Sequence, residues 1–470
     1  MPKDEVNSGF DLHLNLAPDG SRKAALGRAL RQAVGSGRLE PGTTLPSYRT
    51  LAKDLHIARN TVAETYAELV SEGWLEARQG SGTRVAHRAT TTADMPTSTV
   101  PPQLRPTFDF RPGRPDAGSF PRTAWLAAAR RAVGSAPVDA FGPGDPHGRI
   151  ELRRALAGYL ARTRGVSTDP RRIFVCSGFM QAAGFLTRLQ STAPFALESY
   201  GLPFHCRIFE ETGPTISVPV DENGCYIDHL DSTPARTVVL TPSHQFPTGA
   251  PLRPARRTAA VRWARAHDGL VVEDDYDGEF RYDRNPVGAM QALDPDRVLY
   301  LGSVSKSMSP AIRVGWMVVP EHLHDPILAI KGVREGTVGV VDQLTLAELI
   351  TSGAYDRHVR AMRSKYRRRR DELSRALARH APHIGTMGIS AGLQAVLTLP
   401  EGTEKTVLRM AGDAGIALEG LQWFRHPLAL TDTTDAVLVG FSAPSDGSYT
   451  AAVNALVSVL ALTAPSRRRG

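Results

Sequence analysis

The chain has 470 residues, of which 41% are apolar, and a formal net charge of +8. This length and composition exclude a disordered, collagen-like or small disulfide-stapled protein and allow roughly three domains of about 150 residues. The three cysteines (Cys176, Cys206 and Cys225) are too few for a disulfide framework and lack zinc-ligand spacing, so we expect a reducing cytoplasm and no metal. We expect neither a signal peptide nor a membrane-spanning helix, because the N-terminal stretch lacks an apolar core and no long apolar run occurs.

The positive charge is unevenly distributed along the chain. Arginine supplies nearly all of it, because there are only seven lysines, and a GC-rich genome explains that bias without any function. Residues 20–62, however, carry eight Lys/Arg side chains against Glu40 and Asp54. A compact basic block of this kind is typical of a nucleic-acid-binding surface.

Three helices are predicted in and just after this basic block. Small and aliphatic residues recur on one face of residues 21–39, which indicates a first helix. Ser47 is expected to cap a second helix, YRTLAKDLH, and Asn60 or Thr61 to begin a third, TVAETYAELVSEGWL. Two short helices joined by a tight turn form a helix-turn-helix, whose second helix enters the major groove by its N-terminal end, where Arg59 stands.

The next stretch, LEARQGSGTRVA, predicts two short strands around a Gly-Ser-Gly tip, flanked by Arg78 and Arg84. Such a wing can contact phosphates. A small helical domain with an incidental basic face is the alternative, but residues 36–86 resemble the winged-helix domain of the GntR regulators over their whole length. The resemblance implies that Arg49, Arg59, Asn60, Thr61 and Gly82 contact DNA. Arg78 is a further predicted DNA-binding residue because it flanks the tip of the wing.

Residues 86–107 are rich in Thr, Pro and Ala and indicate a linker. The linker would separate a DNA-binding domain, residues 10–85, from a larger domain, residues 108–463. A remainder of this size favours a major and a minor subdomain, and we place the minor one at residues 335–463.

Beyond the linker, strand-like and helix-like segments alternate. RRIFVCSG, TVVLTPSHQ, GLVVEDDY and RVLYLGSVSK each predict a strand, so we expect an α/β fold with a mostly parallel sheet. Ligands of such sheets gather at the carboxyl ends of the strands. A later helix is predicted over Tyr355–His380, and we expect its run Arg367–Arg370 to form a solvated face.

Three of these strand ends carry groups suited to one ligand. Residues 177–181 form a small turn that opens a helix, and its backbone N–H groups offer a phosphate seat. Lys306 would suit Schiff-base chemistry if it is buried, although a lone lysine is more often a surface residue, and Arg313 can clamp an anion. The acidic cluster 273–277 could bind Mg²⁺ or place one carboxylate against a ring nitrogen, and no P-loop accompanies it.

A phosphate, a ring nitrogen and an aldehyde are together the features of pyridoxal 5'-phosphate (PLP). Four motifs resemble fold-type-I aminotransferases: GPGDPHG (142–148), TPSHQFPTG (241–249), EDDYDGEF (273–280) and GSVSKSMSPAIRVGW (302–316). With the winged helix in front, the chain resembles the MocR-type regulators. The resemblance implies a seven-stranded, mostly parallel sheet and a head-to-tail homodimer that binds a double-stranded DNA operator at the nucleoid of a bacterium.

The same resemblance assigns roles to individual residues. Lys306 would form the internal aldimine with PLP, Asp274 would pair with the pyridinium nitrogen, and Tyr276 would contact the ring hydroxyl. The other expected cofactor-binding residues are Ser303, Arg313, Gly178 and Phe179 at the phosphate, His244 and Phe246 beside the ring, and Ser305.

One departure from the family concerns the aromatic residue that stacks on the cofactor ring. Many relatives have Pro-Gly-Tyr where this chain has Glu198–Phe204. Tyr200 or Phe204 would then stack on the ring, or Leu202 would do so poorly.

A second departure concerns the arginine that holds a substrate carboxylate, which is missing from residues 435–444. Arg425 and Arg207 are the candidates, with a surface role as the alternative for both. The leading hypothesis is a transcriptional regulator that senses an amine, an amino acid or PLP itself, as a report of vitamin B6 status, through the aldimine at Lys306. The alternatives are an active PLP-dependent aminotransferase with an accessory DNA-binding module, and a DNA-binding protein whose α/β domain serves only for dimerisation.

Overall fold

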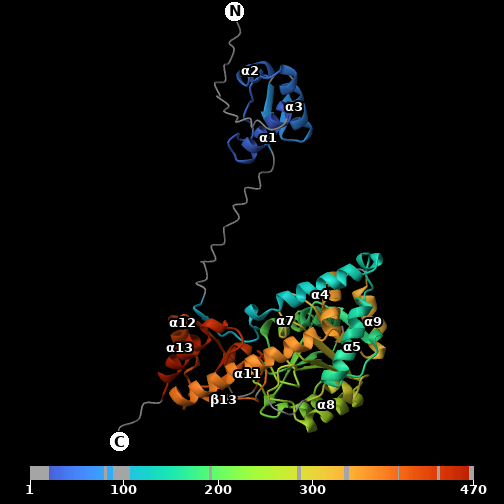
Figure 1. Cartoon of the computed structure of the whole chain (residues 1–470), viewed down its shortest axis with the longest axis vertical. Coiled ribbons are helices and arrows are strands. Elements are labelled where there is room, and N and C mark those ends of the chain that lie inside the picture. Colours follow the sequence, from blue (N-terminus) through green and yellow to red (C-terminus); the bar gives the residue numbers. More distant parts are fainter. Residues whose placement is uncertain are drawn as a thin grey trace, which may run out of the picture. The chain divides into compact units, whose positions relative to one another are not determined.

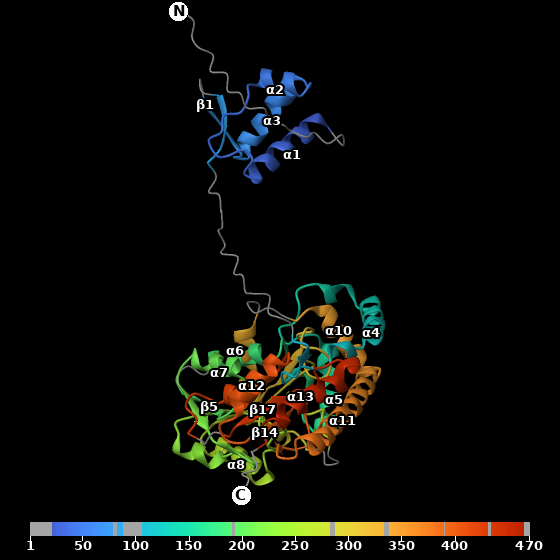
Figure 2. The same cartoon turned by 90° about the vertical axis from the view of Figure 1, so that its left-hand side faces the viewer.

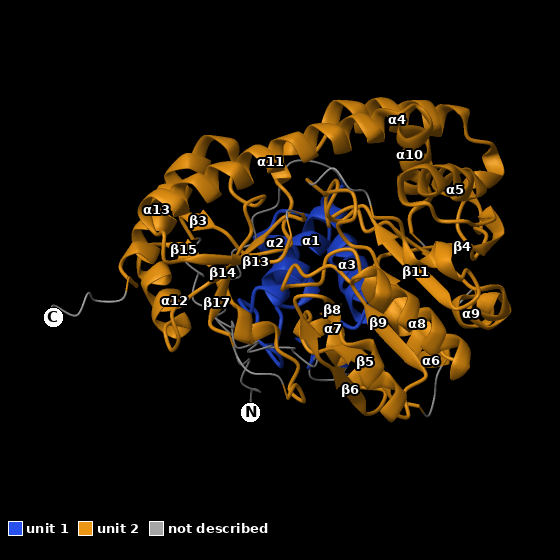
Figure 3. Ribbon diagram, turned by 90° about the horizontal axis from the view of Figure 1, so that it is seen from below, with its two compact units in different colours: residues 1–104 blue, residues 105–470 orange. Residues whose placement is uncertain are grey.

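In the computed structural model the chain forms two compact units, residues 1–104 and 105–470 (Figure 3). The structure describes residues 21–78, 82–87, 106–189, 193–282, 287–332, 338–389, 391–430 and 434–464. The predicted tip of the wing, most of the predicted linker and the first eleven residues assigned to the DNA-binding domain (10–20) lie outside the described residues. No helix within the described ranges is long and apolar enough to cross a membrane.

The first unit contains three helices and one antiparallel hairpin (Figure 2). Its elements are α1 (Arg22–Gly35), α2 (Tyr48–Asp54), α3 (Arg59–Ser71), β1 (Leu75–Arg78) and β2 (Gly82–Val85). The predicted order of elements is confirmed, and the Ser47 hydroxyl caps α2 by accepting a hydrogen bond from the Thr50 amide at 3.2 Å. The third helix begins at Arg59 rather than Asn60 or Thr61, because Ala58 already takes the extended N-cap conformation.

The core of the first unit fixes α3 against the other two helices. Leu30 of α1 and Val62 and Tyr66 of α3 are buried together. The Tyr66 hydroxyl also donates to the Pro46 carbonyl at 3.2 Å, which ties α3 to the turn before α2. Packing therefore uses the middle of α3 and leaves its N-terminal end, with Arg59, exposed.

The second unit is built around the predicted seven-stranded sheet, which is confirmed. In spatial order its strands are β4 (Ile173–Cys176), β12 (Gly315–Val318), β11 (Val298–Ser303), β10 (Leu270–Asp274), β9 (Thr237–Leu240), β5 (Phe195–Glu198) and β6 (Thr215–Val218). All run in the same direction except β12, which is antiparallel to both neighbours. The carboxyl ends of β4, β10 and β11 therefore meet at one edge of the sheet.

Helices and a second sheet complete this unit (Figure 1). The helices are α4 (Arg122–Ser135), α5 (Ile150–Arg164), α6 (Phe179–Leu189), α7 (Pro203–Glu210), α8 (Pro254–Ala266), α9 (His324–Lys331), α10 (Val340–Thr351), α11 (Ala354–His380), α12 (Glu404–Asp413) and α13 (Tyr449–Ala461). The second sheet has the order β13 (Gly385–Met387), β14 (Ala395–Thr398), β17 (Ala436–Val439) and β16 (Glu419–Gly420). The remaining strands form two short pairs, β3 (Phe108–Asp109) with β15 (Ile416–Ala417) and β7 (Val220–Asp221) with β8 (Gly224–Cys225).

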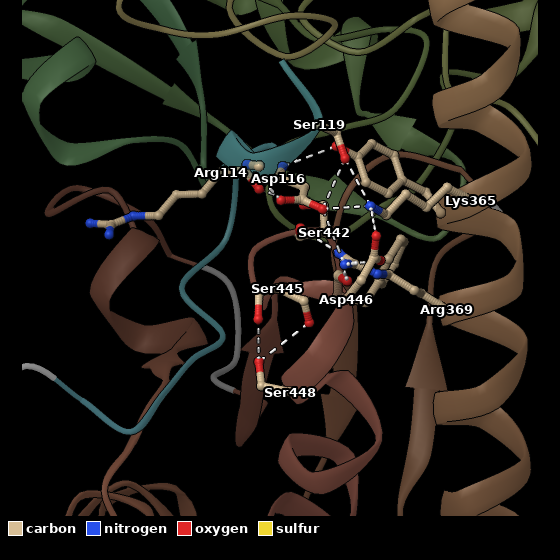
Figure 4. A network of polar contacts seen from close by, with 12 residues as sticks. Arg114, Asp116, Ser119, Lys365, Arg369, Ser442, Ser445, Asp446 and Ser448 are labelled. Carbon is tan, nitrogen blue, oxygen red and sulfur yellow. Dashed lines mark hydrogen bonds and ion pairs between the residues drawn. The ribbon is translucent and has the colours of Figure 1, made fainter. Parts of the chain in front are cut away.

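The long helix α11 was predicted to carry a solvated arginine run, and for Arg369 this prediction is wrong. Arg369 is buried and donates to Asp446 at 2.8 Å and to Asp116 at 3.2 Å, while Lys365 donates to Asp116 at 2.6 Å (Figure 4). Arg367 of the same run is exposed. Side chains two positions apart lie on nearly opposite sides of a helix, so one run of like residues meets both solvent and core.

Candidate functional site

The carboxyl ends of the strands enclose a cavity of about 290 Å³ in the second unit. This volume is near the lower end of the range for small-molecule sites. The structure brings together nine of the predicted cofactor-binding residues in the lining of this cavity: Gly178, Phe179, Phe246, Asp274, Tyr276, Ser303, Ser305, Lys306 and Arg313.

The acidic cluster at the end of β10 does not act as a single group. Glu273 accepts the backbone N–H groups of Met290 and Gln291, and Asp275 forms a buried ion pair with Arg164 at 2.6 Å. Asp274, between them in the chain, lines the cavity. Because successive side chains of a strand point to opposite faces, one carboxyl group faces the cavity and its two neighbours face elsewhere. The three carboxyl groups therefore do not converge on one point, as a Mg²⁺ site would require.

Lys306 places its amine at the cavity and bonds to a distant segment of the chain. Its Nζ donates to the Gly113 carbonyl at 2.6 Å. Burial lowers the pKa of Lys306, although Asp277 and Asp274 act in the opposite direction. A lowered pKa increases the neutral, nucleophilic fraction of the amine.

Asp274 lacks the partners that buried carboxylates usually have. Burial, with Asp275 nearby, raises the pKa of Asp274 to about 7. Within the described part of the chain, the Asp274 carboxyl group has no hydrogen-bond or ion-pair partner. A cationic ring nitrogen in the cavity would supply the missing partner and would restore the ionised form.

The opposite end of the cavity is shaped for an anion. The turn before α6 contains Gly178 with a φ of +107°, a conformation that favours glycine. A Cβ added to Gly315 would lie 2.8 Å from the Cα of Gly178, so only glycine lets β12 approach the turn this closely. The N-terminus of α6, Ser303 and Arg313 therefore face one space, as a phosphate seat requires. With the amine and the carboxyl at the other end, the cavity fits PLP.

His244 lies outside the lining of this cavity, which differs from the expectation that it lines the ring pocket. Its Nδ1 is 3.1 Å from the Tyr276 hydroxyl and 2.9 Å from Oδ2 of Asp277. The imidazole is buried behind the phenol. His244 thus contacts the cavity only through Tyr276.

The aromatic part of the cavity wall includes His205, which the sequence did not single out. Tyr200, Leu202 and Phe204 all line the cavity, so the choice of stacking residue stays open. His205 lines it as well and stacks on Phe179, with ring centroids 4.1 Å apart. Burial, together with the charge of Lys306, lowers the pKa of His205 to about 3, so its ring is a neutral, flat wall at physiological pH.

Neither candidate for a carboxylate-binding arginine lines the cavity. The Arg425 guanidinium donates to the Ala429 carbonyl, and its backbone pairs with Tyr200. Arg207 is exposed on α7. Strand β17, which occupies the expected place of such an arginine, is apolar and fully buried.

The predicted DNA-binding residues are brought together only in part by the first unit. Arg49 on α2 and Arg59 and Asn60 at the start of α3 are exposed, and Thr61 is half-buried. Gly82 begins β2 with a φ of +81°, and the Arg78 backbone pairs with it across the hairpin. The tip of the wing lies outside the described residues.

Replacement of Asp274 with asparagine is expected to stabilise the cofactor-free protein and to weaken cofactor binding. The folded-state pKa of about 7 exceeds the ordinary 3.8, so folding disfavours the ionised carboxyl. The advantage of D274N therefore grows between about pH 4 and pH 7, is fully present above pH 7, and should reach about 0.5–2 kcal/mol. Thermal unfolding without PLP at pH 5 and pH 8 measures it, and an equal melting temperature for both proteins at pH 8 would contradict the expectation.

Comparison with known proteins finds a matching protein family for each of the two units. Residues 22–85 match the bacterial regulatory proteins of the gntR family, and residues 113–424 match the aminotransferases of class I and II. The pyridoxine biosynthesis transcriptional regulator PdxR of Corynebacterium glutamicum is 33% identical over 88% of this chain and 90% of its own. The probable rhizopine catabolism regulatory protein MocR of Rhizobium meliloti is 30% identical over 85% of this chain and 86% of its own. A kynurenine aminotransferase of Pyrococcus horikoshii, at 24% identity, shares the fold with a TM-score of 0.69 over 76% of this chain and 92% of its own.

Proposed function

The chain belongs to the MocR-type regulators, in which a GntR winged helix precedes an aminotransferase-class domain, and we propose that it is a transcriptional regulator whose DNA binding responds to PLP held at Lys306. The observation that carries the proposal is the single cavity that joins Lys306, Asp274 and Arg313 in a chain with a DNA-binding unit. When bound, PLP supplies an aldehyde that reacts with amines.

In this proposal each residue of the cavity has a distinct task. Lys306 supplies the amine that holds the cofactor covalently, and its lowered pKa favours that bond. Asp274 holds the protonated ring nitrogen, and Arg313 with the N-terminus of α6 holds the phosphate. Tyr276 and Phe246 bound the ring on the remaining sides.

A segment next to the predicted linker offers a route from the cavity to the DNA-binding unit. This connecting segment, residues 106–116, is anchored to the minor subdomain by pairing of β3 with β15 and by the buried side chain of Phe110. Within this segment, the carbonyl oxygen of Gly113 accepts the hydrogen bond from Nζ of Lys306. Once the Lys306 amine is bonded to the cofactor, it cannot keep its hydrogen bond to the Gly113 carbonyl. Occupancy of the cavity would therefore change the contacts that hold residues 106–116 in place.

Replacement of Gly113 with alanine is expected to reduce the response to PLP. A Cβ there would lie 2.9 Å from Nζ of Lys306, and the φ of +71° disfavours any side chain. The segment would then leave Lys306 even without cofactor, and the ratio of the DNA dissociation constants with and without PLP should fall roughly 5-fold or more. Fluorescence anisotropy with DNA selected from a random library measures this ratio. Gly412→Ala on α12, where a Cβ meets no atom within 4 Å, is the matched control.

The composition of the lining bears on the effector. Among the described residues, Lys306 and Arg313 are the only lysine or arginine in the lining, and both already have tasks toward PLP. A free amino acid would bring a carboxylate that finds no further guanidinium there. PLP itself, or an amine without a carboxylate, is therefore the favoured effector, and the relative PdxR is named for regulating pyridoxine biosynthesis.

We also propose that the regulator acts as a homodimer. Leu126 and Val133 on α4 are 66% and 38% exposed, and the neighbouring Val138 and Phe141 are 91% and 51% exposed. An apolar face of this kind marks an interaction surface. Two winged helices per dimer would suit paired DNA half-sites.

A further inference from the structure

A buried histidine–carboxylate pair lies directly behind the phenol of Tyr276. His244 and Asp277 are each only 3% exposed, and Nδ1 of His244 is 2.9 Å from Oδ2 of Asp277. The same Nδ1 is 3.1 Å from the Tyr276 hydroxyl. Of the three residues, only Tyr276 lines the cavity, so the pair can act on a bound molecule only through the phenol.

Two glycines hold the imidazole in this orientation. A Cβ added to Gly392 would lie 2.5 Å from Cε1 of His244 and 2.5 Å from Oδ2 of Asp277. A Cβ on Gly249 would lie 3.2 Å from Nε2. Because Gly392 precedes β14, the minor subdomain packs onto the pair and leaves the ring little room to turn.

The position of Asp277 decides which hydrogen bonds His244 can make. Nδ1 carries either a proton or a lone pair, and both of its neighbours meet that one atom. If Nδ1 carried a lone pair, it would face the Asp277 carboxylate without a hydrogen bond. If Nδ1 carries a proton, its N–H group donates to that carboxylate. A buried carboxylate fixes the imidazole tautomer of hydrolase triads in the same way. With the proton on Nδ1, His244 can donate to the oxygen of Tyr276 but cannot accept its proton.

The other groups around the phenol act in the same sense. Burial, with Asp277 and Asp274 nearby, raises the pKa of Tyr276, so the phenol keeps its proton at neutral pH. The buried Gln394 amide and the Asp277 carboxylate both lie beside the phenol. The amide N–H groups could also donate to the phenol oxygen, which leaves the phenol proton for an acceptor elsewhere.

We propose that Asp277 and His244 are positioning residues that direct the Tyr276 hydroxyl into the cavity, as a hydrogen-bond donor to the ring oxygen of PLP. The proposal rests on the proposed function, because it needs PLP in the cavity. A hydrogen bond donated to the ring oxygen reduces the negative charge on that oxygen. In the PLP-loaded protein, this oxygen then attracts the proton on the Lys306 nitrogen less strongly. Loss of the donor should therefore raise the pH at which this proton leaves.

The test follows the visible absorbance of the PLP-loaded protein as a function of pH. His244→Phe removes Nδ1 at nearly constant ring size, and Asp277→Asn removes the constraint on the tautomer. Both should raise the pH midpoint, by roughly one unit for His244→Phe and in the same direction for Asp277→Asn. Tyr276→Phe should raise it at least as much, and His244→Phe should add nothing in the Tyr276→Phe background.

Several outcomes would overturn the proposal. An unchanged midpoint in both variants would mean that the phenol donates to Asp277 and not into the cavity. A further shift in the double variant would show that His244 acts without Tyr276. A shift in His244→Phe without one in Asp277→Asn would remove the role of Asp277. His380→Phe, at the exposed end of α11, is the control that should not shift, and melting curves show that each variant is folded. A wild-type protein that gains no absorbance band with PLP would instead contradict the proposed function.

Discussion

Replacement of Lys306 with alanine is expected to abolish both the visible absorbance band of the PLP-loaded protein and the effect of PLP on DNA binding. The covalent bond to the cofactor needs the amine of Lys306, and the cavity lining contains no second lysine among the described residues. Without that bond, PLP is held only by Asp274, Arg313 and the turn before α6. The variant also lacks the hydrogen bond from Nζ to the Gly113 carbonyl, so its affinity for DNA should be the same with and without PLP.

Two measurements and a control make this expectation sharp. An absorbance titration with PLP reports the bond, and anisotropy of labelled DNA with and without PLP reports the response. Lys405→Ala removes an exposed lysine from α12 and should leave both signals unchanged. A K306A protein whose DNA binding still responds to PLP would show that the response does not pass through this amine.

The second large effect is expected in the first unit. Arg49→Ala with Arg59→Ala should weaken DNA binding roughly 100-fold or more, because each guanidinium contact to phosphate or base contributes about 1–3 kcal/mol. Both side chains are exposed, and neither belongs to the buried core of the unit. The melting temperature should therefore change little.

The control for this variant matches its change in charge. Arg379 and Arg375 are exposed on α11, and their replacement with alanine removes the same charge from the second unit instead of the first. This control should bind DNA as tightly as wild type, and PLP absorbance should persist in both proteins. Equal loss of DNA binding in the two proteins would mean that net charge, and not the end of α3, determines affinity.

Elements with strong local signals were predictable from the sequence. The cap at Ser47, the strands rich in Val and Leu and the long helix α11 are each specified by nearby residues. Lys306 and Asp274 could be found because each follows a buried strand, and parallel strands bring their carboxyl ends to one edge.

The residues that sequence reasoning missed depend on contacts between distant parts of the chain. Gly113 meets Lys306 across 193 positions, and only the Pro-Gly turn signal in RPGRP hints at a special backbone there. The family resemblance of the TPSHQFPTG motif predicts His244 beside the ring, but its contacts with Gly249, Gly392 and Tyr276 place it behind the phenol. The arginine run of α11 predicts a solvated face, but Arg369 pairs with Asp116, which lies 253 positions away in the chain.

The central claim is that this regulator holds PLP covalently at Lys306. Incubation of the full-length protein with PLP, reduction with borohydride and mass mapping of its peptides tests this claim most directly. The account predicts one phosphopyridoxyl group per chain, on the peptide that contains Lys306, with no modification of that position in K306A. Modification spread over surface lysines, or none at all under conditions where a PLP-loaded aminotransferase is labelled, would contradict it.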